Sequence, residues 1–219
     1  MLTKTRLAIM ALVCVAAASP ASANLLTNGS FETGNFVGNA DNAMVLNPGD
    51  TAMTGWTVIN GDLAWIGPAN PFGLSAVNGS YFLDLTGYSD NLPFGGVTQS
   101  IATILGANYS LTFALGGSTA YGVPNSLTAC AGATCSPFLI NATGTNDWAT
   151  ETLNFVGTGN PMAISLTGLA GSKYIGLDNV SVDLLSTDPR SVPEPLTMSI
   201  FGAGLVGVAA LRRRKTKKA

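Results

Sequence analysis

An uncharged apolar run near the C-terminus, from Leu196 to Leu211, limits most strongly how this chain can fold. As a helix these 16 residues would span about 24 Å, slightly less than the roughly 30 Å hydrocarbon core of a bilayer. Six of the eight residues that follow the run are Lys or Arg, and such a cationic flank stays on the cytoplasmic side. The pattern predicts one transmembrane helix, with everything before it on the far side of the membrane.

A short polar motif, Val192-Pro193-Glu194-Pro195, immediately precedes the run. A plain tail anchor would explain the run and its basic flank, but it would not need this motif. The arrangement resembles the PEP-CTERM sorting signal of Gram-negative bacteria, also called the ice-binding protein C-terminal domain. That resemblance implies that an exosortase, a membrane-embedded cysteine protease-transpeptidase, cleaves near the motif. We therefore expect residues 192–215 to form a transient inner-membrane anchor before a basic tail, 216–219, with the membrane stop at Arg212, Arg213, Arg214 and Lys215.

The N-terminus carries a second targeting pattern. Lys4 and Arg6 precede an apolar stretch from Leu7 to Ala18, and Ala21-Ser22-Ala23 has small residues at the spacing of a cleavage site. These features predict a Sec signal peptide over residues 1–23, cut after Ala23. We expect the Sec translocon to export the chain across the inner membrane, and the product to reach the cell surface or the extracellular space.

Between these segments lie residues 24–185, enough for one domain with its own core, and a polar spacer, 186–191. Residues 24–190 hold two basic residues, Lys173 and Arg190, against nine Asp and two Glu, a formal net charge of −9. An acidic surface repels phosphate backbones, so nucleic acid is excluded as a partner. The acidity could favour cations such as calcium, or it could simply keep an exported domain soluble.

The chain contains no histidine, which excludes Ser-His-Asp and Cys-His catalysis and the common zinc sites. Two cysteines, Cys130 and Cys135, remain outside the signal peptide. In an exported protein a pair this close indicates a local disulfide. A redox-active pair is the alternative, but no helix or neighbouring cation is predicted that would lower the pKa of a thiol.

Strand-like patterns run through the domain. Gly, Asn, Ser and Pro clusters separate the runs, and no helical period is found between the two terminal segments. Seven or more short strands favour a two-sheet β-sandwich. Long loops are expected at 34–54, 68–79 and 116–145. The predicted strands are Trp56–Asn60, Tyr81–Leu85, Val97–Thr103, Tyr109–Leu115, Thr150–Phe155, Ala163–Thr167 and Tyr174–Leu184.

The mature chain would open with Asn24 to Gly34, in which Asn28-Gly29-Ser30-Phe31-Glu32 stands out, and Gly55-Trp56 follows about twenty residues later. With the segments 97–113 and 148–155 and the closing strand 174–182, this opening resembles galactose-binding-like jelly rolls. That fold is found in many bacterial carbohydrate-binding modules and in a plant cell-wall protein family of unknown function. The resemblance covers most of residues 24–184 and implies a jelly-roll β-sandwich.

In such modules the Glu of the first strand and the Asp of the last lie together, often around a structural calcium. The resemblance assigns these roles to Glu32 and Asp178. Carboxylate oxygens suit calcium, and ligands from both ends of the domain would tie its termini together. Two alternatives are that the carboxylates accept hydrogen bonds from backbone amides without a metal, and that they form a glycosidase pair. Nothing in the sequence places them across an open cleft, so we predict no enzyme activity.

Aromatic side chains are the other candidates for a site, because flat rings stack on the apolar faces of sugars. Trp56 and Trp148 fall within strand-like runs and are expected in the core. Trp65, Tyr88 and Tyr121 fall beside or within loops, so they are the candidate ligand-binding residues.

These features together predict an exported, exosortase-sorted, non-catalytic surface or matrix protein associated with the exopolysaccharide or biofilm of the cell. The first alternative is a carbohydrate-binding module with a defined sugar specificity. The second is a glycoside hydrolase, which the missing histidine and the missing nucleophile motif disfavour.

Overall fold

The computed structural model describes residues 24–169 and 174–186, and this part of the chain is built from strands, turns and loops. Several predictions lie outside the described residues. They are the signal peptide with Ala21 and Ala23, the motif Val192–Pro195, the apolar run and the stop at 212–215. Within 24–169 and 174–186, no helix has the length and apolar character needed to cross a bilayer.

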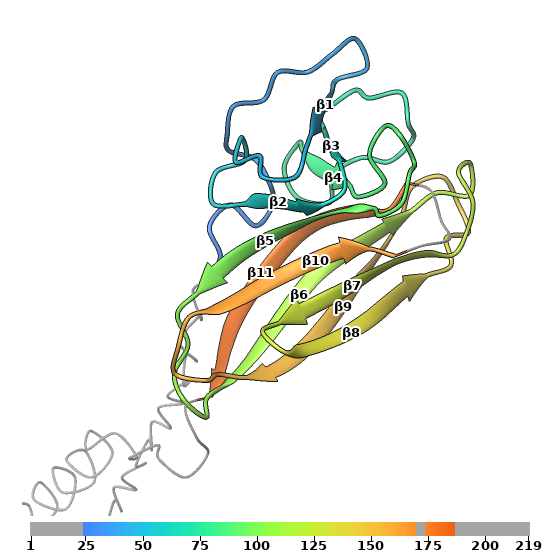
Figure 1. Ribbon diagram of the computed structural model, residues 1–219. Helices are drawn as coiled ribbons and strands as arrows, with labels where there is room; N and C mark the ends of the chain where they lie inside the picture. The colour runs from blue at the N-terminus through green and yellow to red at the C-terminus, as the bar shows by residue number, and fades with distance from the viewer. Residues whose placement is uncertain (1–23, 170–173, 187–219) are drawn as a thin grey trace, which may run out of the picture.

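Two antiparallel sheets form a β-sandwich, in which one sheet follows the order β1-β3-β4-β11-β6-β9 and the other the order β2-β5-β10-β7-β8 (Figure 1). The predicted all-β sandwich is therefore confirmed. Short strands β1 to β4 and their loops gather at one end of the long strands. The strands are β1 Ala43–Leu46, β2 Thr57–Asn60, β3 Leu63–Ile66, β4 Phe82–Asp84, β5 Gly95–Ile101, β6 Asn108–Gly117, β7 Asn125–Ala131, β8 Thr134–Ile140, β9 Asp147–Val156, β10 Met162–Gly168 and β11 Gly176–Ser186.

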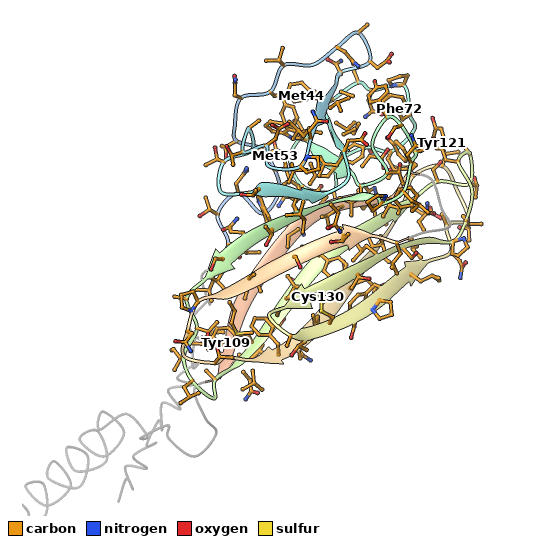
Figure 2. The ribbon with its side chains drawn as sticks, viewed as in Figure 1. Met44, Met53, Phe72, Tyr109, Tyr121 and Cys130 are labelled. Atoms are coloured by element: carbon orange, nitrogen blue, oxygen red, sulfur yellow. A yellow bond between two sulfur atoms is a disulfide. The ribbon has the colours of Figure 1, made fainter. Side chains whose placement is uncertain are left out.

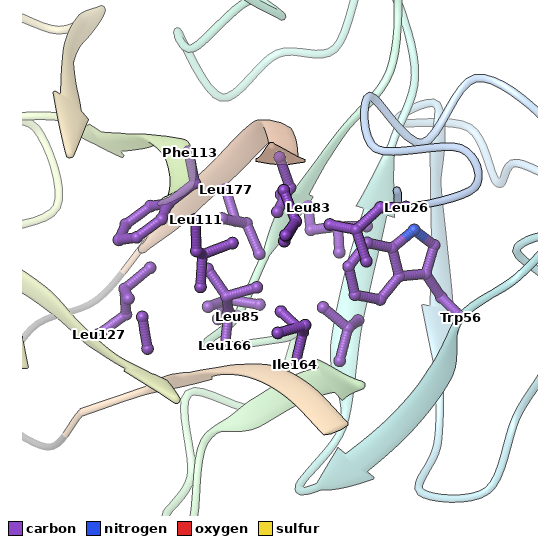
Figure 3. Packing of buried hydrophobic residues seen from close by; sticks show 14 of the residues in the cluster. Leu26, Trp56, Leu83, Leu85, Leu111, Phe113, Leu127, Ile164, Leu166 and Leu177 are labelled. Carbon is purple, nitrogen blue, oxygen red and sulfur yellow. The ribbon is translucent and has the colours of Figure 1, made fainter. Parts of the chain in front are cut away.

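The main core fills the space between the sheets (Figure 3). Side chains alternate along a strand, so every second residue of each long strand points inward. Leu111 and Phe113 of β6 and Leu177 of β11 meet Leu127 of β7 and Leu166 of β10 in this layer. Burial of these apolar side chains supplies most of the free energy that holds the two sheets together.

A second, smaller apolar cluster covers the outer face of the six-stranded sheet. In β3, Leu63 and Trp65 belong to the main core, whereas Ala64 and Ile66 belong to this outer cluster. All four residues of β3 are buried, because the loop that carries Leu74 folds back over the outer face. The six-stranded sheet is thus covered on both sides at its β3–β4 end.

Three of the strands lie within the predicted long loops, and a fourth, β3, was missed for another reason. β1 lies within the expected loop 34–54, and β7 and β8 lie within the expected loop 116–145. β3 was not expected as a strand because all of its residues are buried, so it lacks the alternation of apolar and polar residues that marks a strand. Trp56 is buried as expected, and Trp148 packs against the outer cluster.

The β7–β8 hairpin carries the predicted disulfide. Cys130 and Cys135 are directly opposite each other in the antiparallel register, and their sulfur atoms are bonded at 2.12 Å. The bond therefore joins the two strands of a hairpin at the edge of the five-stranded sheet.

Candidate functional site

Glu32 and Asp178 both bind the loop at 77–81. Glu32 Oε1 accepts hydrogen bonds from the amides of Ser80 and Tyr81, each at 2.8 Å. Asp178 is fully buried, and its Oδ2 accepts the amides of Val77 and Asn78 at 2.7 and 3.0 Å. Two carboxylates from the two ends of the domain's sequence therefore hold one loop.

Both carboxylates are adapted to this hydrogen-bonding role. Burial, opposed by the amide donors and assisted by the negative charge of Glu32, raises the pKa of Asp178 to about 6. Gly79 has a positive φ of 79°, and a Cβ there would overlap the Glu32 carboxylate.

Amide donors use three of the four carboxylate oxygens of Glu32 and Asp178, counting the Asn179 N–H on Asp178 Oδ1, whereas calcium takes about six to eight oxygen ligands. This arrangement fits a backbone clamp better than a calcium site, and calcium stays a prediction.

A cleft of about 130 Å³ opens on the outer face of the six-stranded sheet, beside the outer cluster. Its lining residues belong to β3 and β4, to the loops that follow these two strands, and to the loop between β6 and β7. Tyr174, which lies just before β11, completes the lining. Phe72 lies among the loops around the short strands, and Tyr121 lies at the neighbouring ends of the long strands (Figure 2). The lining residues are Ala64, Ile66, Phe72, Asp84, Gly87, Tyr88, Asp90, Tyr121 and Tyr174. We refer to this feature as the aromatic cleft.

Ring contacts organise the walls of the aromatic cleft. Tyr121 stacks on Tyr174 with ring centroids 4.8 Å apart and an angle of 28° between the planes. Phe72 contacts Tyr174 at 5.9 Å and meets Tyr88 edge to face at 6.1 Å. Tyr88 and Tyr121 keep 42 and 37% of their surface exposed, so both rings can be reached from solvent.

The Tyr88 ring is held by its hydroxyl. Asn39 Nδ2 donates to Tyr88 Oη at 2.9 Å, and Tyr88 Oη donates to Asp41 Oδ2 at 3.1 Å. Both partners belong to the loop that precedes β1. The ring is therefore fixed in orientation before any ligand arrives, which lowers the entropy that binding would cost.

Asp84 is the buried charged group of the cleft, with 4% of its surface exposed. Its Oδ1 accepts hydrogen bonds from the Thr86 amide, the Thr86 hydroxyl and the Ile175 amide, at 2.9 to 3.1 Å. Burial raises the pKa of Asp84 to about 7 against the effect of these donors, and the charge of Asp90 raises it further. All three of these hydrogen bonds end on Oδ1.

Tyr174 carries a polar atom that the described residues do not satisfy. Only 5% of this side chain is exposed, and its Oη has no hydrogen-bond partner among residues 24–169 and 174–186. Burial and the charge of Asp84 raise the pKa of the hydroxyl, so it stays protonated at any physiological pH.

Comparison with known families identifies the domain. Residues 24–181 match the model described as a protein of unknown function, DUF642. The chain belongs to the DUF642 family. Residues 191–215 of this DUF642 chain match the PEP-CTERM protein-sorting motif, as the sequence predicted, so the protein is an exosortase substrate exported to the cell envelope of a Gram-negative bacterium. A comparison with curated proteins found no match.

Solved structures similar to this DUF642 chain include carbohydrate-binding modules, and the likeness concerns the fold alone. TmCBM61 in complex with beta-1,4-galactotriose is 21% identical, covers 74% of this chain and 99% of its own, and has a TM-score of 0.40. A family 35 carbohydrate-binding module from Clostridium thermocellum is 13% identical, covers 64% of this chain and 96% of its own, and has a TM-score of 0.43. A xylan-binding domain from Paenibacillus barcinonensis is 14% identical, covers 78% of this chain and 100% of its own, and has a TM-score of 0.42.

The structure separates the three aromatic candidates. Tyr88 and Tyr121 both line the aromatic cleft. The placement of Trp65 beside a loop is wrong, because it lies in β3 with 1% of its surface exposed and its Nε1 donates to the Phe31 carbonyl at 3.1 Å. A ring enclosed on both faces cannot stack on a sugar, so Trp65 is a core residue.

Four further residues of the cleft were not found from the sequence: Phe72, Asp84, Asp90 and Tyr174. Asp84 did leave a signal, because it is the one charged residue in the apolar segment Phe82–Leu85. Tyr174 begins the last predicted strand, and nothing in its local pattern marks it as a site residue. Phe72 and Asp90 lie in loops, where the sequence does not indicate which side chains converge.

Proposed function

We propose that this DUF642 chain is a non-catalytic surface or matrix protein whose domain binds a polysaccharide of the cell envelope in the aromatic cleft. The observation that carries the proposal is the convergence of Tyr88 and Tyr121 with a buried carboxylate, Asp84, in one cleft. Stacked rings bind the apolar face of a sugar, and a carboxylate oxygen accepts hydrogen bonds from its hydroxyl groups.

The size of the cleft supports recognition of a single sugar unit. Pockets for drug-sized ligands enclose about 300–1,000 Å³, whereas the cleft encloses about 130 Å³. A side group or the end of a chain fits this volume better than several consecutive units do. Affinity for one unit would be weak, and many copies on a surface would raise it through multivalency.

A glycan array probed with the purified full chain in detergent tests the binding function. We expect binding to a defined set of glycans, and Tyr121→Ala should weaken it by about tenfold, because it removes one of the two exposed rings on which a sugar can pack and a loss of about 1.4 kcal/mol is tenfold in affinity. Leu139→Ala, which truncates an exposed side chain of β8 outside the cleft, is the matched control. Binding that is unchanged in Tyr121→Ala and in Tyr88→Ala would remove the cleft from the proposal.

The same material tests the non-catalytic role. Incubation with the glycans that bind should release no product. Turnover that disappears in Asp84→Asn would instead favour the hydrolase alternative, because a carboxyl with a pKa near 7 beside Asp90 is suited to general acid catalysis.

The sorting segment is proposed to be a transient anchor, because the apolar run is shorter than a typical permanent span of about 20 residues. Intact-mass analysis of the surface protein should show that Arg212 to Ala219 are missing. Glu194→Ala should leave membrane insertion intact and block release. Mature protein that keeps the tail in cells with an active exosortase would contradict the transient anchor.

A further inference from the structure

Exposed aliphatic side chains lie at the end of the sandwich where β11 ends. Figure 1 shows the β5–β6 turn and the ends of β9 and β11 at this end, away from the short strands β1 to β4. Ile104 and Leu105 belong to the turn, Val156 ends β9, and Leu185 is the last residue but one of β11. Each of the four keeps between 53 and 78% of its surface exposed. We refer to them as the apolar tip.

Backbone pairing brings the parts of the apolar tip together. Asn108, the first residue of β6, pairs with Val156 of β9 on one side and with Ser186 of β11 on the other. Gly157 N–H donates to the Ala107 carbonyl at 2.8 Å, which joins the β9–β10 turn to the β5–β6 turn. The two turns therefore lie side by side next to the end of β11.

The β5–β6 turn is held in shape by hydrogen bonds within the domain. Ile104 N–H donates to Tyr109 Oη at 2.9 Å, and the buried Tyr109 ring, labelled in Figure 2, stacks on Phe155. Thr103 Oγ1 donates to the Asn160 carbonyl at 2.8 Å. Backbone groups that already have partners are not costly to remove from water, so such a turn can enter the edge of a lipid layer.

The two turns of the tip carry no charge. Residues 102–108 and 156–161 include no Asp, Glu, Lys or Arg, and Asp183 is the described carboxylate nearest to the tip in sequence. Asp41 and Asp62 lie in the loops around the short strands, at the other end of the long strands. Anionic lipid headgroups repel carboxylates within about a Debye length, so the uncharged end is the one suited to face a membrane.

The chain itself brings this end to a membrane. The apolar run of the sorting segment begins at Leu196, ten residues after Ser186, where β11 ends. Ten residues reach at most about 33–36 Å when fully extended, so the tip stays near the bilayer while the run spans it. A short tether raises the effective concentration of the tip at the surface, so that insertion of a few side chains is enough for contact.

We propose that the apolar tip inserts into the outer leaflet of the inner membrane while the sorting segment anchors the chain. The domain then rests on this end and holds the motif Val192–Pro195 near the leaflet surface, where a membrane-embedded exosortase can reach it. The aromatic cleft includes the loop between β6 and β7, at the other end of the long strands, and stays open to a polysaccharide. This inference rests on the proposed transient anchor and gives the anchored domain an orientation.

Fluorescent labels at two exposed leucines test the insertion. Leu105→Cys and its matched control on β8, Leu139→Cys, are made in the full chain with Cys14→Ser, since Cys130 and Cys135 are bonded to each other. Each labelled chain is reconstituted in vesicles of phosphatidylethanolamine and phosphatidylglycerol that contain nitroxide-labelled lipids. We expect the lipids to quench the label of Leu105→Cys at least about twofold more than that of Leu139→Cys, because inserted side chains lie about 5–10 Å deep.

A polar tip should abolish the contact. Ile104→Ser/Leu105→Ser changes exposed side chains only, and a thermal melt checks that the variant folds. A label on Asn160→Cys, exposed in the neighbouring turn, should lose its quenching by lipid nitroxides in this variant. Val37→Ser/Val45→Ser removes two exposed aliphatic side chains at the other end of the domain and should leave that quenching unchanged.

Vesicle flotation separates this inference from the anchor on which it rests. A chain that floats with the vesicles while the label of Leu105→Cys stays unquenched would overturn the inserted tip and keep the anchor. A label that leaves water without quenching by lipid would assign the tip to a second copy of the chain, and shielding that needs added exosortase would assign it to the protease. Either result would overturn the lipid contact, and a full chain that does not float with the vesicles would end both proposals.

Discussion

At its β3–β4 end the six-stranded sheet is buried on both faces, yet the two faces are built differently. The inner face meets the five-stranded sheet through aliphatic and aromatic side chains such as Leu111, Leu177 and Trp65. The outer face is covered by loops and encloses two carboxylates, Asp84 and Asp178, together with the hydroxyl of Tyr174. The inner face therefore provides stability, and the outer face provides a place where a ligand can interact with buried polar groups.

The polar groups of the outer face tolerate burial because loops bring amides to them. Asp178 accepts three backbone N–H groups, and Asp84 accepts two backbone N–H groups and one hydroxyl. A strand buried against another sheet has no free amides, since the ladder already uses them. A loop-covered face can hold charge inside a domain, whereas a sheet-covered face cannot do so without large cost.

The largest expected effect concerns the inner face. Trp65→Ala should destabilise the domain by about 3–5 kcal/mol, because it empties a fully buried volume and leaves the Phe31 carbonyl without its donor. Tyr88→Ala on the outer face should cost much less, since that ring is 42% exposed. Denaturant unfolding of both variants measures the difference. A stable Trp65→Ala variant that has lost glycan binding would restore the sequence-based assignment of Trp65.

The pH dependence of stability should come mainly from the outer face. Burial raises the pKa of Asp84 from 3.8 to about 7 and that of Asp178 to about 6, so the folded state holds protons that the unfolded chain releases. Their contribution is fully present below about pH 4 and is lost as the pH rises to about 7. At pH 5 the solution lies about two pH units below the folded-state pKa of Asp84 and about one below that of Asp178, so we expect the domain to be about 4 kcal/mol more stable at pH 5 than at pH 8, measured by urea unfolding.

Substitution assigns this slope to residues. Asp84→Asn should flatten most of the change between pH 6 and 8, and Asp178→Asn should act mainly at lower pH. A wild-type domain whose stability rises steadily from pH 5 to 8 would contradict the burial of ionisable groups on the outer face.

The disulfide of the five-stranded sheet should contribute about 2 kcal/mol, because it closes a short loop of sequence separation 5. The Cys130→Ser/Cys135→Ser variant should unfold at lower denaturant but keep glycan binding, since neither residue lines the aromatic cleft. Loss of binding in a folded double variant would show that the hairpin supports the cleft after all.

The smallest expected effect is that of calcium. Amides already occupy most of the oxygens of Glu32 and Asp178, so the melting temperature should be the same with excess calcium chloride and with chelator. A clear rise with calcium would establish the metal site that the jelly-roll resemblance implies. The same melt with Gly79→Ala should be lower under both conditions, because a Cβ would displace Glu32.

Sequence patterns located strands in which large apolar side chains recur at every second residue. The segment 109–115 was predicted because Leu111, Phe113 and Leu115 recur every second residue, and it lies within β6. β3 was missed, since Leu63 to Ile66 are all apolar and the pattern of a strand buried on both faces has no period. β7 and β8 were missed because small and polar residues, such as Ser126, Thr128 and Ser136, make the segment resemble a loop.

The sequence by itself determined the sorting motif, the all-β class, the disulfide pair and the lack of histidine, because each depends on local composition or spacing. Tertiary structure alone decided that Trp65 is core, that Glu32 and Asp178 clamp one loop, and that Phe72, Asp84 and Tyr174 join Tyr88 and Tyr121 in a cleft. The named residues of the cleft are separated by up to 102 positions, from Phe72 to Tyr174, and Glu32 and Asp178 are 146 positions apart. Long-range convergence of this kind depends on how loops fold over a sheet, which no local pattern of a single sequence records.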